Sequence, residues 1–556
     1  MKKFFKNWFA SGEPWIWMNA AAVGISIVAI VGILALIAAK GFAHFWPSEV
    51  LEITYEDADG QTQVVYAEAV ESERISTQQF LESGGNPRWA EGQPDTMLRT
   101  LYKSGNRKHN APDFRWIFEA QLQQVELPED VVVIERVEWG NAYGRLDELA
   151  LHSGIDKPDQ IEAFHAAVER ANEIRVQIDE LEGGVLNHIN YQLERLRLER
   201  RGIELRGADA ANPRLAEIAT EVAALRADYL VHEADLRELY AELSRDESWI
   251  RTADGQRIEM NVSEILSFWQ PNVMSGIDRF SHGVSAVWRF LTEDPREANT
   301  EGGIFPAIFG TVLMVLLMSV IVTPFGVIAA IYLREYAKQG FLVRTIRIAV
   351  NNLAGVPSIV YGVFGLGFFV YFLGGNLDRL FYPEALPSPT FGTPGLVWAS
   401  LTLALLTVPV VIVSTEEGLT RIPRSLREGS LALGATKSET LFKVILPMAS
   451  PSILTGVILA VARAAGEVAP LMLVGVVKLA PTLPLDGNFP YLHLERKFMH
   501  LGFHIYDVGF QSPNVDAARP LVYATALLLV TIIVALNLTA ITLRSRLERR
   551  YRGVES

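Results

Sequence analysis

The 556-residue chain contains no cysteine. A disulfide-stabilised scaffold is therefore excluded, and so are thiolate metal sites and thiol catalysis. The pattern G-x-x-x-x-G-K-[ST] is also absent, which predicts that this chain does not itself bind and hydrolyse ATP. The ten histidines form no H-E-x-x-H pair, and the single H-x-E, His493 to Glu495, has no cysteine to complete a deaminase-type zinc site. These absences give an enzyme little support, and we expect no cofactor in the chain.

Long apolar runs, by contrast, are abundant. A helix needs about 20 apolar residues to cross the hydrocarbon core of a membrane. Six runs meet this length, and the first is too long for the apolar part of a cleaved signal, so it predicts an anchor. The chain is therefore predicted to be an α-helical multi-pass membrane protein. The six spans are expected near residues 15–39, 304–333, 348–373, 396–413, 453–477 and 521–543.

Basic residues in the short connections predict the orientation, because cytoplasmic loops are enriched in Lys and Arg. With the N-terminus inside, both termini are cytoplasmic and the large segment after the first span is external. The four cytoplasmic pieces then hold 17 basic residues and the two short external loops hold 4. The cytoplasmic pieces are 1–14, 334–347, 414–450 and 544–556, and the short external loops are 375–395 and 477–518.

The external segment carries most of the acidic groups. Residues 49–303 have a net charge of −23 and the remainder +9. Such a domain repels small anions and does not resemble a nucleic-acid-binding surface. Two explanations stay open, solubility in a salty medium and an acidic docking face.

Two textures occur within the external segment. Residues 48–155 and 249–262 are β-rich, with a hairpin signal at 52–66 around Asp57-Ala-Asp-Gly60. Residues 158–246 predict a helical hairpin, because apolar residues from 215 to 243 keep a coiled-coil 3-4 spacing. Its second helix, about 31 residues long, would extend on the order of 45 Å from the membrane-proximal part. We interpret this hairpin as a protein-docking module.

The segment between the fourth and fifth spans predicts two short helices joined by a sharp turn. Ser425-x-x-Glu428 and Thr436-x-x-Glu439 are capping boxes, and Gly434 between them suits a left-handed helix end. Pro447 is expected to stop the second helix. Such a rigid knob at the membrane surface could fit the groove of a partner.

Two charges stand out inside the fifth apolar run. Arg463 and Glu467, at i and i+4, are expected to share one helix face near the middle of the bilayer. A charge at that depth costs roughly 2.5–3.5 kcal/mol on insertion scales, so neither is expected to face lipid. One interpretation is a structural ion pair. The other is a polar transport path, in which the fork of Arg463 binds a tetrahedral oxyanion and Glu467 balances or gates it.

Four strings then resemble one family: 353–362 (LAGVPSIVYG), 414–418 (STEEG), 425–436 (SLREGSLALGAT) and 462–471 (ARAAGEVAPL). They are similar to the phosphate-specific ABC transporter permease, PstA-type subunit. The resemblance runs from about 302 to 550 and implies the type I ABC importer fold. It implies Arg463 and Glu467 as the transport-path pair, and Glu428, Gly434, Leu446 and Pro447 in an ATPase-coupling (EAA) loop at 415–447. The predicted organisation is 1–40, tail and first span; 41–303, an inserted α+β external domain with a coiled-coil hairpin; and 304–556, the permease core.

The resemblance also implies partners and a location. These are a sister permease, two ATP-binding subunits that hold the ATP, and a periplasmic phosphate-binding protein. The expected location is the bacterial inner membrane, with the large domain periplasmic. A permease for sulfate or molybdate stays as the alternative, since it would share the loop and an intramembrane cation. The insertion has no place in the usual short form of the family.

Overall fold

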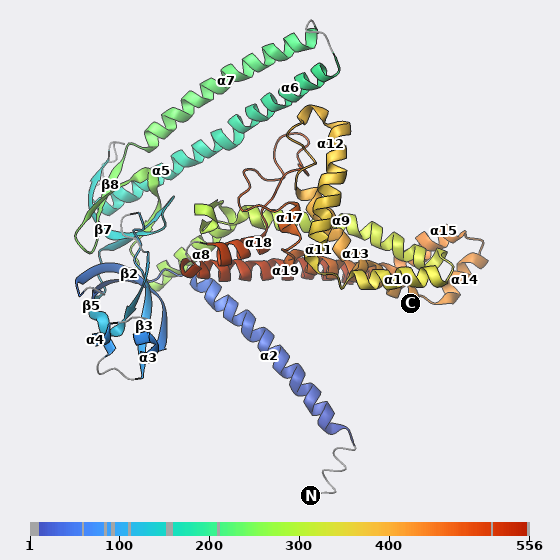
Figure 1. Ribbon diagram of the computed structural model, residues 1–556, viewed down its shortest axis with the longest axis horizontal. Helices are drawn as coiled ribbons and strands as arrows, with labels where there is room; N and C mark the ends of the chain where they lie inside the picture. Colours follow the sequence, from blue (N-terminus) through green and yellow to red (C-terminus); the bar gives the residue numbers. More distant parts are fainter. Residues whose placement is uncertain are drawn as a thin grey trace.

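The computed structural model describes residues 11–57, 60–82, 86–90, 95–108, 113–151, 159–207, 212–512 and 515–552. Two parts are visible in Figure 1: a bundle of long helices, and a β-rich domain with a long helical hairpin. The domain is built from residues between the first and second spans, as the sequence predicts. Within the described residues six helices are long and apolar enough to cross a membrane, which confirms the expected number. These spans are Glu13–Ala43 (α2), Phe305–Tyr336, Ser358–Phe381, Leu396–Arg421, Lys437–Gly466 and Ala518–Arg546.

The third span differs from the predicted 348–373. An amphipathic helix, α10 (Phe341–Leu353), ends before Pro357, and the span begins afterwards at Ser358. Proline disfavours helical geometry in the residue before it, so the apolar run divides at this point. The span then continues through α11 (Ser358–Phe364), a π-helical stretch (Gly365–Gly374) and α12 (Gly375–Phe381).

The fifth span also differs from the predicted 453–477. Its helix starts at Lys437 as α15 (Lys437–Thr440), passes a π-helical turn (Leu441–Ile445) and continues as α16 (Leu446–Gly466). It ends at Gly466, and a short helix α17 (Leu471–Val474) follows. Hydropathy averaged over this region cannot detect the break, because the residues on both sides of it are equally apolar.

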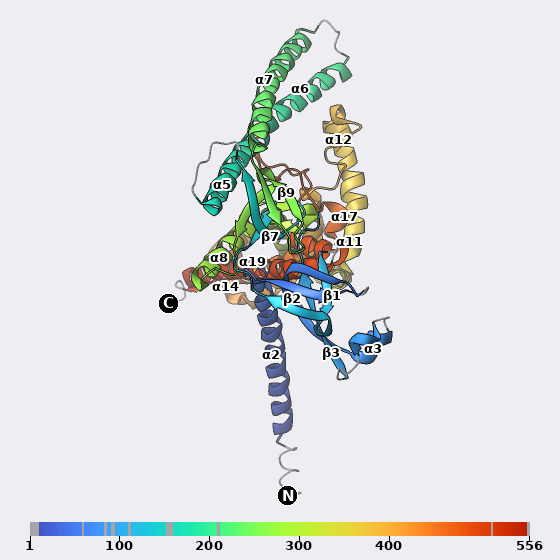
Figure 2. The ribbon, with the colours of Figure 1, turned by 90° about the vertical axis from the view of Figure 1, so that its left-hand side faces the viewer.

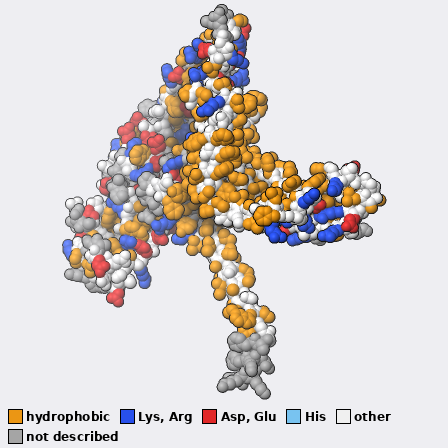
Figure 3. Space-filling model, turned by 45° about the vertical axis from the view of Figure 1, so that its right-hand side comes forward, with side chains coloured by type: hydrophobic (Ala, Val, Ile, Leu, Met, Phe, Trp, Pro, Cys, Tyr) orange, Lys and Arg blue, Asp and Glu red, His pale blue; other side chains and the backbone are white. Residues whose placement is uncertain are grey.

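Three spans build the centre of the bundle: α9 (Phe305–Ile331), α13 (Leu396–Arg421) and α16. Small residues let them approach closely, and a Cβ on Gly326 of α9 would lie 2.6 Å from Val411 of α13. The last helix, α19 (Val515–Arg552), packs against α16 and the outer end of α2. Figure 3 shows hydrophobic side chains covering the outside of the bundle, with Lys and Arg gathered at the end that carries α14 (Arg424–Ala432) and α15.

The β-rich domain contains two five-stranded antiparallel sheets. Sheet A has the order β4-β3-β2-β1-β5, and its β1–β2 pair confirms the predicted hairpin. Sheet B has the order β10-β6-β7-β8-β9, so β-structure extends to Trp269, beyond the expected 262. The strands are Val50–Glu56 (β1), Thr62–Ser76 (β2), Thr96–Lys103 (β3), Phe114–Phe118 (β4), Leu122–Glu126 (β5), Val131–Arg136 (β6), Ala142–Ala150 (β7), Glu247–Arg251 (β8), Arg257–Asn261 (β9) and Ile265–Trp269 (β10). Two short helices, α3 (Thr77–Glu82) and α4 (Pro87–Ala90), accompany sheet A, and a two-residue pair, β11 (Pro295–Arg296) with β12 (Glu301–Gly302), precedes α9.

The helical hairpin is inserted between the neighbouring strands β7 and β8. Its first arm is continuous, from α5 (Gln160–Asp179) through a π-helical stretch (Glu180–Leu186) to α6 (Asn187–Leu205), and its second arm is α7 (Pro213–Leu243). The apolar stripe of α5 packs mainly on sheet B, where Phe164 and Ile174 join the core of Ile134 and Ile250. The two arms also pack on each other: near the sheet Leu236, Leu239 and Leu243 of α7 join this core, and in the distal part Ile218 packs against Leu196 and Ile203 of α6.

The hairpin extends from the β-rich domain past the end of α12, and its second arm has the expected 31 residues (Figures 1 and 2). Its first arm also contacts loops of the helical bundle. His188 of α6 lies 2.7 Å from Asn488, in the loop between the fifth and sixth spans, measured from Nδ1 to Oδ1. The Tyr191 hydroxyl donates to the Phe489 carbonyl, and the distal part of α6 contacts residues 383–385. Polar side chains of α6 therefore bind loops between the spans of the same chain.

Candidate functional site

Two interrupted helices meet inside the bundle. The first break separates α10 from α11. The Tyr361 hydroxyl of α11 spans this break, because it donates to the carbonyl of Leu353, the last residue of α10, at 2.6 Å. The second break follows Gly466. The two touch where a Cβ on Gly362 would lie 2.7 Å from the Pro470 Cα, a distance that only glycine permits. Interrupted helices are common where membrane transporters bind their substrates, because the freed backbone groups line a cavity.

The predicted charged pair lies at the second break. Arg463 is in the last turn of α16, and Glu467 is the first residue beyond the helix, with extended backbone (φ −79°, ψ 130°). The expectation of one shared helix face near mid-span is therefore wrong in detail, because Gly466 ends the helix first. The two groups still face each other, with Arg463 Nε 3.6 Å from Glu467 Oε1.

The surroundings of Arg463 leave its donors available. Among the described residues its guanidinium makes no hydrogen bond. The side chain of Arg463 is 35% exposed and that of Glu467 is 20% exposed. Small buried residues of α16, Ala460, Ala464 and Ala465, pack into the bundle core beside it. A guanidinium has five donors in a planar fork, and a single ion pair at 3.6 Å uses none of them at hydrogen-bond distance. The site can therefore accept an anion with several oxygens.

The coupling segment forms a sharp turn at the other end of the bundle. Gly434 has φ +88°, its N–H donates to Leu431, and the N–H of Ala435 donates to Ser430. These are the two bonds of a Schellman motif, so the predicted left-handed end at Gly434 is confirmed. The capping box of Thr436 with Glu439 is confirmed as well.

Two other expectations for this segment are wrong. Helix α14 begins after Pro423 without a side-chain cap, so Ser425 and Glu428 form no capping box. Pro447 does not stop the second helix. It lies in the first turn of α16, directly after the π-helical turn, where a missing N–H is tolerated. The second helix of the knob is thus the start of the fifth span.

Contacts that the sequence did not reveal attach this knob to the bundle. Arg427 pairs with Glu335 at 3.0 Å and donates to the Leu419 carbonyl at 2.6 Å. Leu446 packs in a small core beneath the turn. Two large apolar side chains of this segment are widely exposed among charged ones, Leu433 at 91% and Phe442 at 65%, and Glu428 is exposed as well. A rigid turn with an exposed apolar tip is suited to enter a partner's groove.

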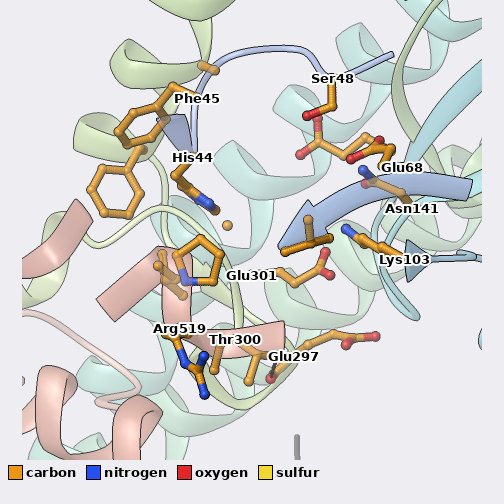
Figure 4. A pocket seen from close by; sticks show the side chains of 18 of the residues that line it. His44, Phe45, Ser48, Glu68, Lys103, Asn141, Glu297, Thr300, Glu301 and Arg519 are labelled. Carbon is orange, nitrogen blue, oxygen red and sulfur yellow. Dashed lines mark hydrogen bonds between the residues drawn. The ribbon is translucent and has the colours of Figure 1, made fainter. Parts of the chain in front are cut away.

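A cavity of about 910 Å³ lies between the β-rich domain and the adjoining ends of the spans. Figure 4 shows Lys103, Glu68 and Glu301 gathered in it. Burial lowers the pKa of Lys103, but the carboxylates of Glu68 and Glu301 raise it, and the net shift is upward. The lining holds nine carboxylates against seven Lys and Arg side chains. This excess of negative charge makes the cavity a poorer anion site than the open fork of Arg463.

The loop between the fifth and sixth spans, which contacts α6, is stiffened by its own charges. Asp486 pairs with Arg496 at 2.6 Å and accepts from His493 at 3.0 Å. Burial raises the pKa of Asp486, but its hydrogen bonds and the charge of Arg496 lower it to about 2. His493 also meets Glu495 at 3.2 Å, so the His-Leu-Glu string belongs to this loop network.

Comparisons with known proteins agree on a family. Residues 322–553 match the family described as binding-protein-dependent transport system inner membrane component, and the β-rich domain lies outside this match. The phosphate transport system permease protein PstA of Mycobacterium leprae is 34% identical over 49% of this chain and 82% of its own length. PstA of Yersinia pestis is 32% identical over 53% of this chain and 91% of its own length. A probable PstA of Methanocaldococcus jannaschii is 32% identical over 43% of this chain and 74% of its own.

Among solved structures, the inward-facing MetNI methionine ABC transporter is 19% identical with a TM-score of 0.32, covering 49% of this chain and 99% of that one. The names of the sequence relatives describe permeases rather than enzymes. With its six spans and extra α+β domain, the chain therefore belongs to the PstA family of transport system permease proteins.

Proposed function

We propose that this chain is the PstA-type membrane subunit of an ATP-driven importer of inorganic phosphate. The observation that carries the proposal is Arg463, whose donors are free at the junction of two interrupted helices. The fork of an arginine matches the oxygens of a tetrahedral oxyanion, and Glu467 beside it keeps the binding weak enough for release. The PstA relatives support phosphate over sulfate or molybdate as the substrate.

In this proposal a sister permease supplies the other half of the path. A periplasmic phosphate-binding protein delivers phosphate to the external side, and the two permeases enclose it beside Arg463. Two ATP-binding subunits then drive the alternation of access by rigid-body movement. ATP binds only to those subunits, and this chain carries no cofactor and performs no hydrolysis.

The coupling loop is the proposed contact with one ATP-binding subunit. The exposed tip around Leu433 enters the partner's groove, and Gly434 keeps the turn sharp. Glu428 lies exposed on α14 for a polar contact. Leu446 and Pro447 connect the knob to the fifth span without a flexible joint, so a movement of the knob is transmitted to α16 and Arg463.

We further propose the bacterial inner membrane as the location, with both termini cytoplasmic and the β-rich domain periplasmic. The distribution of basic residues supports this orientation, since Lys and Arg gather at the end with α14 and α15 (Figure 3). The hairpin would then lie over the external mouth. From there α6 and α7 would guide the binding protein towards the permease pair.

The test is reconstitution of the chain with its three kinds of partner in proteoliposomes. ATP inside the vesicles and phosphate-loaded binding protein outside should give uptake of radiolabelled phosphate. A hundredfold excess of sulfate or molybdate should leave this uptake unchanged. Competition by sulfate or molybdate at concentrations equal to phosphate would instead favour a permease for another oxyanion.

A further inference from the structure

Helix α8 (Gly276–Thr292) connects the external domain to the second span and carries an exposed apolar stripe. Four large side chains of the stripe recur at the 3-4 spacing of one helix face. They are among the most exposed apolar residues of the domain: Ile277 at 81%, Phe280 at 65%, Val284 at 54% and Trp288 at 67%. A row of this kind marks a surface that is covered in the working protein.

The opposite face of α8 is fixed to the domain by polar contacts. Arg279 pairs with Glu49 at 3.1 Å, and Arg289 pairs with Glu135 at 2.5 Å. The His282 ring lies 4.5 Å from the Trp269 ring. These contacts determine which way the helix is turned, so the apolar stripe points away from the domain.

The outer ends of two membrane spans flank α8. Phe45, just beyond the end of α2, has its ring 5.1 Å from the Phe290 ring of α8. At the other end, the Ile304 N–H donates to the Phe290 carbonyl at 2.9 Å, and α9 starts at Phe305. Figures 1 and 2 show α8 at this junction of domain and bundle. Trp46, 48% exposed at the same junction, is a residue type enriched at the membrane–water boundary.

We propose that α8 lies in the outer membrane–water interface with its apolar stripe among the lipid chains. An amphipathic helix that lies in this plane buries its apolar face several ångströms below the headgroups. The two arginines of α8 are already paired with the domain, so the seating depends on apolar contact and not on anionic lipid. The adjoining spans hold α8 at this depth. The domain, attached through Arg279 and Arg289, is thereby kept at a fixed height and tilt beside the bundle.

The absence of cysteine allows a direct test by site-directed spin labelling of the full chain in phosphatidylcholine nanodiscs. Ile277→Cys and Val284→Cys place labels on the stripe. Ser285→Cys places one on an exposed neighbouring position outside it, and Ala234→Cys on α7 is the aqueous reference. Each label is scored by its collisions with oxygen, which concentrates in lipid, and with a water-soluble nickel complex.

We expect labels at 277 and 284 to favour oxygen over nickel several-fold more than the label at 234. The label at 285 should be intermediate. Exchanging a third of the lipid for phosphatidylglycerol should not change the ratios. Nickel accessibility at 277 and 284 equal to that at 234 would overturn the proposal. Shelter from both reagents would overturn it as well, because a protein partner would then cover the stripe.

Discussion

Replacing Arg463 by glutamine tests the transport path most directly. The change keeps a polar side chain of similar length but removes the charge and the fork. We expect phosphate uptake to fall while the complex still assembles, because Arg463 makes no hydrogen bond among the described residues and holds only one ion pair.

The size of the effect follows from the geometry of the free fork. A phosphate held by two N–H donors of Arg463 would lose two charge-assisted hydrogen bonds in Arg463→Gln. Hydrogen bonds to charged groups contribute roughly 1.5–3 kcal/mol each, which gives about 3–6 kcal/mol in total. Because every 1.4 kcal/mol is tenfold, uptake at limiting phosphate should fall by roughly a hundredfold or more. Arg463→Lys keeps the charge without the fork, so its loss should be about half as large in free energy.

The assay is the initial rate of radiolabelled phosphate uptake in proteoliposomes that contain all subunits. Size-exclusion chromatography of the purified complex checks assembly for each variant. Glu467→Gln serves as the matched variant on the other partner. It removes the balancing charge, so phosphate should bind more tightly and leave more slowly, which lowers KM and the maximal rate together.

Two results would refute this reasoning. Normal uptake by Arg463→Gln would show that the guanidinium does not meet the substrate. Loss of the Arg463→Gln protein from the membrane would be the second such result. If Arg463→Lys then restored the protein and transported phosphate at the parent rate, the ion pair with Glu467 would be structural.

Three further changes test other parts of the molecule. Gly434→Val should cost about 1–2 kcal/mol through its left-handed backbone and reduce co-purification of the ATP-binding subunit. Gly429→Val, in an open helical position, is the control and should leave co-purification intact. Burial raises the pKa of Glu135, but Arg289 and Arg296 lower it to about 2. The stabilisation by these ion pairs is therefore complete above about pH 4.5 and is lost as the pH falls towards 2. Glu135→Gln should therefore destabilise the protein by about 3 kcal/mol at pH 7, and its thermal unfolding should approach that of the parent below pH 3. Residues 160–243 can be replaced by a short Gly/Ser linker, because the flanking strands β7 and β8 are adjacent. This deletion should reduce phosphate uptake at limiting phosphate more than at saturating phosphate. Uptake equal to that of the parent at all concentrations would exclude a role of the hairpin in delivery.

Local patterns in the sequence determined much of this protein. Runs of about 20 apolar residues specify six spans because the hydrocarbon thickness sets the length. The left-handed turn at Gly434 and the cap at Thr436 follow from neighbouring residues alone, and so does the β1–β2 hairpin. Each of these features forms within a few residues of chain, so periodicity and turn chemistry are sufficient to predict it.

Tertiary structure decided the features that depend on distant residues. The breaks before Ser358 and after Gly466 lie within two of the predicted spans, and only the packing of Gly362 on Pro470 brings them together. The stripe of α5 has helical spacing that suits either a coiled coil or a sheet, and sheet B, assembled from strands on both sides of the hairpin, determined its partner. The direction of the hairpin depended on Asn488 and Phe489, 300 and 298 residues from their partners on α6. Such contacts leave no periodic signal in one sequence, because the residues that form them are near each other only after the chain has folded.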